Sequence, residues 1–238
     1  MIQRATNYIS FSLWGQDPIY NIGVIRNAEL AKTIYPNWEM IVFHDETVPQ
    51  ETIKSLQDLN VNLKNMSKSK MYGMFWRFLA TEIPESNYVI FRDADSRIGQ
   101  RERLAVDEWI QSGKTLHVMR DHPFHMIPCG NYELGILGGM WGIKSGNFSM
   151  LSNLKNIPYI NQHRYGNDQT FLRSIYETFK NDKITHDEFF DGKPFPMPRD
   201  EKRFIGERID INEKPLNNDC DLIENYQFKN LTQPNFRC

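Results

Sequence analysis

The chain has 238 residues, 40% of them hydrophobic and 13% aromatic, and a formal net charge of −2 at pH 7. This composition is sufficient for the core of one large domain and excludes a globally disordered chain. The absence of a basic surplus argues against nucleic acid or an anionic membrane surface as a partner. We expect one domain over residues 1–210 and a C-terminal extension over 211–238 packed on it.

Cysteine usage and terminal composition bear on the compartment. Cys129, Cys220 and Cys238 are odd in number and far apart, so neither a CxxC zinc pair nor a disulfide framework is predicted. The first twelve residues lack a basic stretch followed by an apolar one, and no run of about 18 apolar residues occurs. We therefore expect a cytoplasmic protein with no signal peptide and no transmembrane segment.

Strand-like and helix-like patterns alternate along the first half of the chain. Apolar runs predict strands over residues 8–14, 39–43, 61–63, 88–91 and 115–119. Apolar residues at helical spacing predict helices over residues 19–35, 49–59, 71–81 and 101–111. This alternation predicts an α/β fold, with a doubly wound and mostly parallel sheet flanked by helices.

The second half of the chain is less regular. A glycine-rich stretch over residues 135–142 precedes a predicted helix near 147–154. A further helix is predicted over 168–180, followed by a short strand-like run over 183–185. Beyond this point the prolines predict a loop-rich C-terminal segment; they are Pro194, Pro196, Pro198 and Pro215.

The strand over residues 88–91 runs almost directly into Asp93 and Asp95. Residues i and i+2 of an extended backbone point to the same side, so both carboxylates would project from the strand's carboxyl end, where α/β folds bind ligands. Two such charges are unfavourable together unless a cation joins them, and hard oxygen ligands favour Mg²⁺ or Mn²⁺. The alternative is a surface turn with two solvated aspartates.

A calcium-binding loop and a phosphatase nucleophile are two other functions for an aspartate pair. A calcium-binding loop starting at Asp93 requires an oxygen ligand at its fifth position, glycine at its sixth and glutamate at its twelfth. Those positions hold Arg97, Ile98 and Leu104, so this reading fails. A phosphatase with Asp93 as its nucleophile would place the pair on an earlier strand, and this reading stays open.

Several segments together resemble the GT-A glycosyltransferases, most closely a family of small members found in large algal viruses and some bacteria. The matching segments are Tyr20-Asn-Ile-Gly23 with Arg26-Asn27-Ala28, Gly73-Met-Phe-Trp-Arg77, Phe91-Arg-Asp-Ala-Asp-Ser-Arg97, Met119-Arg-Asp-His-Pro123, Leu137-Gly-Gly-Met-Trp-Gly142 and His186-Asp-Glu-Phe-Phe190 with Pro194-Phe-Pro196. The resemblance covers roughly residues 7–210.

The resemblance implies a GT-A-like (Rossmann-like) fold, with a mixed and mostly parallel sheet. It also implies transfer of a hexose or deoxyhexose from a nucleoside-diphosphate sugar, of the UDP type, to a glycan or glycoconjugate acceptor, with Mn²⁺ or Mg²⁺ as cofactor. The rival functions are a metal-dependent phosphohydrolase or nucleotidyltransferase, and a glycan-binding module without catalysis.

Residues near the ends of the first two strands are candidates for binding the nucleoside. In a nucleotide-binding α/β fold the turn after the first strand meets the base and ribose, which indicates Ser12, Leu13 and Trp14. Tyr20 is a candidate for stacking on the base, and Asp45 for bonding the uracil edge or ribose. For Trp14 and Tyr20 the alternative is a role in capping the core.

A second group of candidates surrounds the aspartate pair. Arg77 precedes the pair by one strand, and its planar fork suits Asp93, a donor phosphate or a structural salt bridge. Ala94 lies between the two aspartates and is a predicted donor contact. Gly138 and Gly139 offer backbone without side chains, to which a sugar or phosphate can come close; a tight turn is the alternative.

The catalytic candidates are Asp121 and Asp168. Asp121 follows the fifth predicted strand and is predicted to contact a sugar hydroxyl. Asp168 opens a helix, where it is a candidate for orienting or activating a sugar hydroxyl and alternatively a helix N-cap. Neither residue distinguishes retention from inversion at the sugar carbon.

The resemblance also suggests a third metal ligand late in the chain. His186 is the candidate, although its spacing to the following glycine is longer than in the family pattern. Lys193 is predicted to cover the diphosphate from a C-terminal loop. The alternatives are a strand-end histidine bonded to the backbone and a solvated lysine.

Overall fold

A computed structural model describes residues 5–125, 128–129, 132–133, 135–146, 148–164, 166–190, 192–200, 203–216, 221 and 223. The three cysteine side chains and most of the predicted extension 211–238 lie outside these residues. Among the described residues, no helix is long and apolar enough to cross a bilayer.

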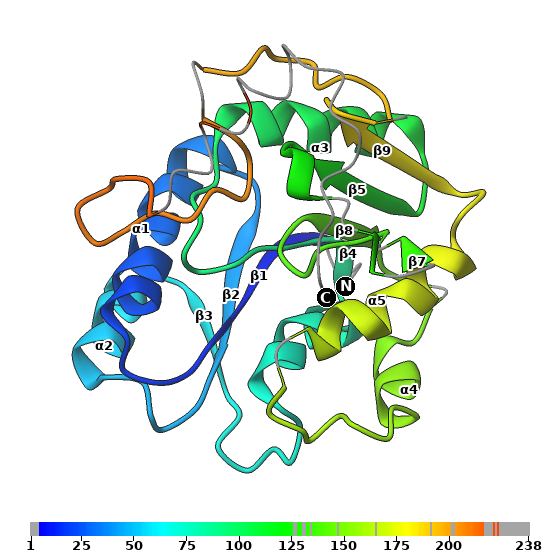
Figure 1. Cartoon of the computed structure of the whole chain (residues 1–238). Coiled ribbons are helices and arrows are strands. Elements are labelled where there is room, and N and C mark those ends of the chain that lie inside the picture. The colour runs from blue at the N-terminus through cyan, green and yellow to red at the C-terminus, as the bar shows by residue number, and fades with distance from the viewer. Residues whose placement is uncertain are drawn as a thin grey trace.

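A seven-stranded sheet forms the centre of the molecule, in the order β3-β2-β1-β4-β8-β5-β9 (Figure 1). Its strands are β1 (Thr6–Leu13), β2 (Glu39–His44), β3 (Asn62–Asn65), β4 (Ser86–Phe91), β5 (Leu116–Arg120), β8 (Trp141–Lys144) and β9 (Lys183–Asp187). The helices are α1 (Pro18–Ile34), α2 (Gln50–Asp58), α3 (Gln100–Ser112), α4 (Met150–Lys155) and α5 (Asn167–Thr178), with 3₁₀ helices η1 (Gly73–Glu82) and η2 (Pro123–His125). A separate two-stranded sheet pairs β6 (Pro128–Cys129) with β7 (Tyr132–Glu133).

All strand pairs of the large sheet are parallel except those of β8, which runs antiparallel to both β4 and β5. The mixed, mostly parallel sheet expected of a GT-A-like fold is thus confirmed. The sequence did not predict β8 itself, because its residues follow a glycine-rich stretch and number only four.

Both faces of the sheet are covered, which explains the continuous apolar runs in its strands. Along β1, Tyr8 belongs to one apolar cluster and Ile9 to the other. The Tyr8 cluster contains side chains of η1, α4 and α5, and the Ile9 cluster those of α1, α2 and α3. Burying one large apolar side chain stabilises a fold by about 1.5–3 kcal/mol, so both clusters stabilise the sheet and the helices packed on it.

The aromatic segment predicted as a helix over residues 71–81 is a 3₁₀ helix. Two serine hydroxyls of β1 bond the backbone of Arg77. Ser10 Oγ donates to the Arg77 carbonyl at 2.7 Å, and the N–H of Arg77 donates to Ser12 Oγ at 2.9 Å. These bonds draw both polar backbone groups of Arg77 toward the sheet. They also place the Arg77 side chain beside the ends of β1 and β4.

The described residues 192–200 and 203–216, here called the strap, follow β9 (Figure 1, orange at its end). Three residues of the strap form isolated β-bridges: Lys193 pairs with His186, and Ile209 pairs with Pro215. The strap contains no described helix or longer strand. It meets the end of β4 where the N–H of Ile209 donates to the Asp95 carbonyl at 2.7 Å. The loop-rich segment predicted from the prolines therefore lies beside the aspartate pair.

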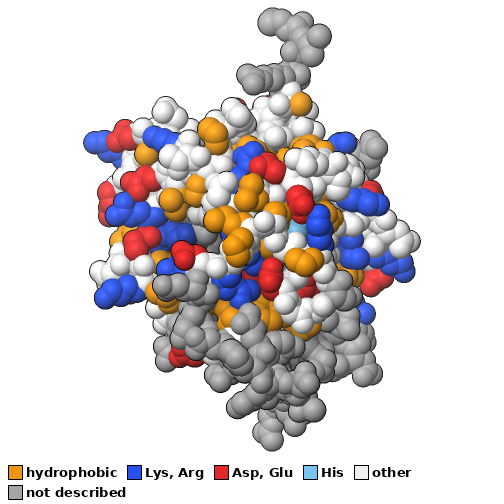
Figure 2. All heavy atoms as spheres, turned by 90° about the horizontal axis from the view of Figure 1, so that it is seen from above, with side chains coloured by type: hydrophobic (Ala, Val, Ile, Leu, Met, Phe, Trp, Pro, Cys, Tyr) orange, Lys and Arg blue, Asp and Glu red, His pale blue; other side chains and the backbone are white. Residues whose placement is uncertain are grey.

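The face of the molecule seen in Figure 2 carries acidic and basic side chains interspersed with hydrophobic ones. Among the described residues on this face, no continuous basic surface is present. This mixed pattern agrees with the net charge of −2 and differs from the basic stripe typical of nucleic-acid-binding proteins.

Candidate functional site

A cavity of about 630 Å³ opens where β1 and β4 end. The β1 end and the α1 helix supply Ser12, Leu13, Trp14 and Tyr20. Other predicted site residues that line it are Arg77, Asp93, Ala94, Asp95, Gly138 and Asp168. Because β1 and β4 are parallel, their carboxyl ends meet at one edge of the sheet and bring these residues together.

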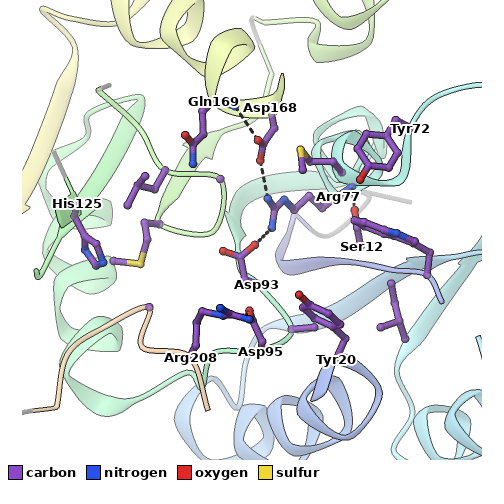
Figure 3. A pocket seen from close by; sticks show the side chains of 18 residues that line it. Ser12, Tyr20, Tyr72, Arg77, Asp93, Asp95, His125, Asp168, Gln169 and Arg208 are labelled. Carbon is purple, nitrogen blue, oxygen red and sulfur yellow. Dashed lines mark hydrogen bonds and ion pairs between the residues drawn. The ribbon is translucent and has the colours of Figure 1, made fainter. Parts of the chain in front are cut away.

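Arg77 lies between two carboxylates at the centre of the cavity (Figure 3). Its NH1 donates to Asp93 Oδ1, and its NH2 to Asp168 Oδ2 at 3.1 Å. The side chains of Arg77 and Asp168 are each 7% exposed, whereas that of Asp93 is 50% exposed. Arg77 therefore fixes a carboxylate whose other oxygen remains available to a ligand.

Asp168 is held on both of its oxygens. Oδ2 accepts from Arg77, and Oδ1 accepts from the backbone N–H of Gln169 at 2.9 Å. Burial raises the pKa of Asp168, Arg77 lowers it, and the charge of Asp93 raises it. The N-cap of α5 is Gly166 rather than Asp168, so Asp168 lies in the first turn of the helix and faces the cavity.

Asp95 is paired with a residue of the strap. Arg208 Nε donates to Asp95 Oδ2 at 2.8 Å. Burial and the charge of Asp93 raise the pKa of Asp95, while Arg208 lowers it. The two aspartates thus repel each other, and each is neutralised in part by one arginine.

The aspartate pair fits a hard divalent cation that brings other ligands with it. Arg77 bonds Asp93 Oδ1 and Arg208 bonds Asp95 Oδ2, so these two arginines occupy only one oxygen of each carboxylate. Among the described residues, no group of three or more His, Cys, Asp or Glu side chains is placed to hold a metal alone. Mg²⁺ and Mn²⁺ commonly complete their shells with water and substrate phosphate oxygens, so two carboxylates are sufficient.

Gly138 and Gly139 make room for the site's own side chains. A Cβ on Gly138 would overlap Asp168 Oδ2 and Arg77 NH2, and one on Gly139 would overlap Asp93 Oδ2. Gly138 lines the cavity, whereas Gly139 lies behind Asp93. The close approach that these glycines permit is therefore that of the Asp93, Arg77 and Asp168 side chains.

One end of the cavity is aromatic. The rings of Trp14 and Tyr72 meet edge to face with centroids 5.6 Å apart, and Trp14 meets Trp76 in the same way at 6.2 Å. Tyr20 is 37% exposed and lines the same cavity. Ser12 also lines the cavity, and its Oγ accepts a hydrogen bond from the backbone N–H of Arg77.

The structure places Asp45 outside the cavity. Its Oδ1 accepts from the N–H of Thr47 at 3.0 Å and from Thr47 Oγ1 at 2.5 Å, and Thr47 Oγ1 accepts from the N–H of Gly15 at 2.6 Å. Asp45 thus ties the turn after β2 to the turn after β1. We leave it out of the set of direct ligand contacts.

The structure also places Asp121 away from the cavity and leaves it fully buried. Its carboxylate accepts from Arg101 at 2.9 Å, from Arg199 at 2.6 Å and from the N–H of Ile205 at 2.9 Å. With every oxygen engaged by the chain itself, Asp121 anchors the strap instead of contacting a sugar. The sequence did not predict this anchoring role, because the three partners are distant from Asp121 along the chain.

His186 and Lys193 form a cluster outside the cavity. The ring of His186 is fully buried, with Nδ1 2.9 Å from His117 Nε2 and Nε2 2.8 Å from Glu108 Oε2. Lys193 Nζ donates to Glu108 Oε1 at 2.8 Å. Because both ring nitrogens already have partners, we leave His186 out of the metal site. Lys193 does not line the cavity, so we leave it out of the diphosphate site.

Eight residues that line the cavity were not among the predicted ones, and four of them are polar: Tyr72, His125, Gln169 and Arg208. The sequence did predict basic cover from the C-terminal segment, but at Lys193 instead of Arg208. The bond from Ile209 to Asp95 sets which residue of the strap reaches the cavity, and no local pattern encodes that register.

No protein-family model matches the chain, and no curated protein matches it. Among solved structures it is similar to a glycosyltransferase involved in the glycosylation of the major capsid of PBCV-1, with 14% identity, 77% of this chain and 82% of the other covered, and a TM-score of 0.43. It is also similar to residues 1–349 of S. aureus TarS, with 11% identity, 79% and 59% coverage and a TM-score of 0.48.

A third similar structure is a cytidylyltransferase from Leptospira borgpetersenii serovar Hardjo-bovis, with 16% identity, 81% and 79% coverage and a TM-score of 0.45. The chain spans about three-fifths of the TarS fragment and about four-fifths of the other two proteins. At such identities the likeness concerns the fold alone. An assignment of function must therefore rest on the cavity.

Proposed function

We propose that this protein is a metal-dependent glycosyltransferase that moves a hexose or deoxyhexose from a nucleoside-diphosphate sugar, of the UDP type, to a hydroxyl of a glycan. One observation carries the proposal. Asp93 and Asp95 emerge together from a buried strand into a cavity of about 630 Å³, with cationic Arg77 and Arg208 beside them. This arrangement suits a phosphate-bound cation.

The shape of the cavity suggests how the donor would lie. The aromatic end formed by Trp14, Tyr20 and Tyr72 offers ring faces and edges for a nucleoside base. The aspartate pair comes next along the cavity (Figure 3). The diphosphate would then lie over Asp93 and Asp95, and the sugar beyond them.

In the proposed reaction the chain's own residues hold and orient the donor. Asp93 and Asp95 would hold Mn²⁺ or Mg²⁺, which supplies positive charge to the departing diphosphate. Arg77 keeps Asp93 in one orientation, and Asp168 keeps Arg77 in place. Because both oxygens of Asp168 are engaged, we assign it to positioning instead of proton transfer.

Nucleotide-sugar binding is tested with the purified chain and a panel of nucleotide sugars. We expect a UDP-sugar to raise the melting temperature in Mn²⁺ but not in EDTA. Asp95→Asn should remove the metal-dependent shift without lowering the melting temperature of the free protein, since it relieves repulsion from Asp93. Asp107→Asn, a matched change in a surface pair with Arg103, should behave like the wild type.

The product of slow donor hydrolysis then identifies the bond that is cleaved. A glycosyltransferase acting on water releases intact UDP, because the bond broken is at the sugar carbon. Release of UMP would instead indicate attack at phosphorus, as in a phosphohydrolase or a nucleotidyltransferase. An unchanged nucleotide affinity in EDTA would remove the metal from the proposal.

A further inference from the structure

His125, the last residue of η2, lines the cavity and was not among the predicted site residues. Its Nδ1 accepts a hydrogen bond from the backbone N–H of Asp121 at 3.0 Å. A backbone N–H is only ever a donor, so this bond requires Nδ1 to be without a proton. The neutral ring consequently carries its proton on Nε2.

The bond that fixes this tautomer is itself well supported. The N–H of His125 donates to the carbonyl of His122 at 2.9 Å, which closes the short η2 turn. The ring of Phe204, from the strap, packs on both histidines, with centroids 4.5 Å from His122 and 5.7 Å from His125. The carboxylate of Asp121 is anchored by Arg101 and Arg199, so its backbone N–H does not move freely.

The surroundings of His125 also favour a neutral ring. Burial and the neighbouring His122 lower the pKa of His125 to about 3, helped by Arg199 and Arg120, although Asp121 acts in the opposite direction. A second proton would have to replace the lone pair that accepts from Asp121. The imidazole is therefore an uncharged hydrogen-bond donor at neutral pH.

The Nε2–H group of His125 donates no hydrogen bond within the described part of the chain. In Figure 3 the imidazole lies on one side of the cavity, and Tyr20 and Tyr72 lie on the other, with Asp93 between them. Leu137 and Met140 line the same cavity. An N–H group in such surroundings is costly to desolvate unless a ligand oxygen accepts from it.

We propose that His125 is a ligand-binding residue whose Nε2–H donates to an uncharged oxygen, hydroxyl or carbonyl, on the carbohydrate part of the substrate. This inference rests on the proposed function, which puts the nucleoside at the aromatic end and leaves the His125 end for a sugar. The oxygen belongs either to the donor sugar or to the acceptor. A neutral donor suits both, because neither carries charge at its hydroxyls.

Two substitutions separate the two nitrogens of the ring. In His125→Asn the amide oxygen takes the place of Nδ1 and can accept from Asp121, but the donor in the cavity is lost. In His125→Gln the amide nitrogen takes the place of Nε2 and can donate into the cavity, but the acceptor for Asp121 is lost. The pair thus tests ligand binding against a purely structural role.

We expect His125→Asn to keep the wild-type melting temperature. It should either weaken binding of the nucleotide sugar about tenfold or raise the KM for the glycan acceptor about tenfold. His125→Gln should have a lower melting temperature than the wild type, but its affinity for the nucleotide sugar and its KM for the acceptor should stay within about twofold of the wild-type values. The affinity for UDP in Mn²⁺ should be unchanged in both variants. An effect on nucleotide-sugar affinity assigns the oxygen to the donor sugar, and an effect on the acceptor KM alone assigns it to the acceptor.

The opposite ranking, with His125→Asn fully active and His125→Gln impaired, would overturn the proposal. A wild-type protein that binds no nucleotide sugar would overturn the proposed function together with this inference, whereas a His125→Asn variant that binds and transfers normally overturns the inference alone. Nitrogen-15 NMR of the ligand-free protein at pH 7 gives an independent test. It should show His125 as the neutral Nε2–H tautomer, and an Nδ1–H tautomer or an imidazolium contradicts the inference.

Discussion

The guanidinium of Arg208 lies against the carboxylate of Asp95, with Nε 2.8 Å from Oδ2, although 113 positions separate the two residues in the sequence. The pair exists because the strap returns to the end of β4, where Ile209 bonds the Asp95 backbone. A cation from the chain thus stands beside the carboxylate that the proposed metal would use. Metal binding and this ion pair are therefore expected to compete.

Removing the competing cation is expected to strengthen metal binding. Arg208→Met should bind Mn²⁺ about fivefold more tightly than the wild type in the absence of nucleotide, since a half-exposed ion pair contributes up to about 1 kcal/mol. Calorimetric titration with Mn²⁺ measures this directly. Arg203→Met changes a charge on the same strap, in a residue paired with Glu207, and should leave the affinity as it is. Equal or weaker binding by Arg208→Met would contradict the competition.

Gly139→Ala should damage the site without altering any charge. Its new methyl group would overlap Asp93 Oδ2 and force the carboxylate to rotate. We expect metal-dependent binding of a UDP-sugar to weaken at least tenfold, a loss on the order of 1.4 kcal/mol. Gly99→Ala is the control, because a Cβ there meets nothing within 4 Å. Equal affinities in the two variants would show that Asp93 tolerates displacement.

Arg77→Met should lower the free energy of unfolding by about 3–5 kcal/mol, because it leaves Asp168 buried without its charged partner. Urea denaturation at pH 7 measures the loss, with the exposed Arg164→Met as the control. The loss should shrink at pH 5. Burial already raises the pKa of Asp168, so the folded carboxyl binds a proton more readily than the unfolded one, and stability is regained as pH falls through the folded pKa. A loss that is the same at both values contradicts this account.

The buried histidine pair should make the fold sensitive to acid. His186 donates to Glu108 and accepts from His117, and burial, His186 and Arg92 lower the pKa of His117 well below its usual value. Between pH 7.5 and 5.5 the unfolded ring gains a proton and the folded ring does not, so stability is present above about pH 6.5 and is lost below it.

His117→Gln keeps a donor for His186 and removes the titrating ring. It should reduce the loss of unfolding free energy between pH 7.5 and 5.5 by about 1.4 kcal/mol. Urea denaturation at the two pH values measures the difference. The same substitution at His163, an exposed residue, serves as the comparison. An unchanged pH dependence in His117→Gln would show that the pair does not titrate as described.

Much of the fold could be predicted because its strands and helices are long enough to show their periodicity. The apolar run before Asp93 also located the aspartate pair at a strand end, which the structure confirms. By contrast, β8 was missed, since a four-residue strand after glycines has no distinct pattern. The 3₁₀ form of η1 depends on hydroxyls of β1, which the segment's own sequence does not reveal.

The remainder of the site depends on contacts between distant parts of the chain. Asp121 and His125 lie four positions apart, and the sequence alone gave the cavity role to Asp121. The reversal arises because Arg101 and Arg199 take up the carboxylate, while the Asp121 backbone orients the histidine ring. Such assignments require the positions of the partners, and these are set by tertiary packing.

The position of β8 also has a consequence for synthesis of the protein. This strand lies between β4 and β5 in the sheet but follows β5 in the chain. While the ribosome adds the roughly 20 residues from β5 to β8, at about 5–20 residues per second, both neighbouring strands have an unpaired edge for about 1–4 seconds. Open edges pair readily with other chains, so slow translation over residues 120–144 is expected to lower the yield of folded protein.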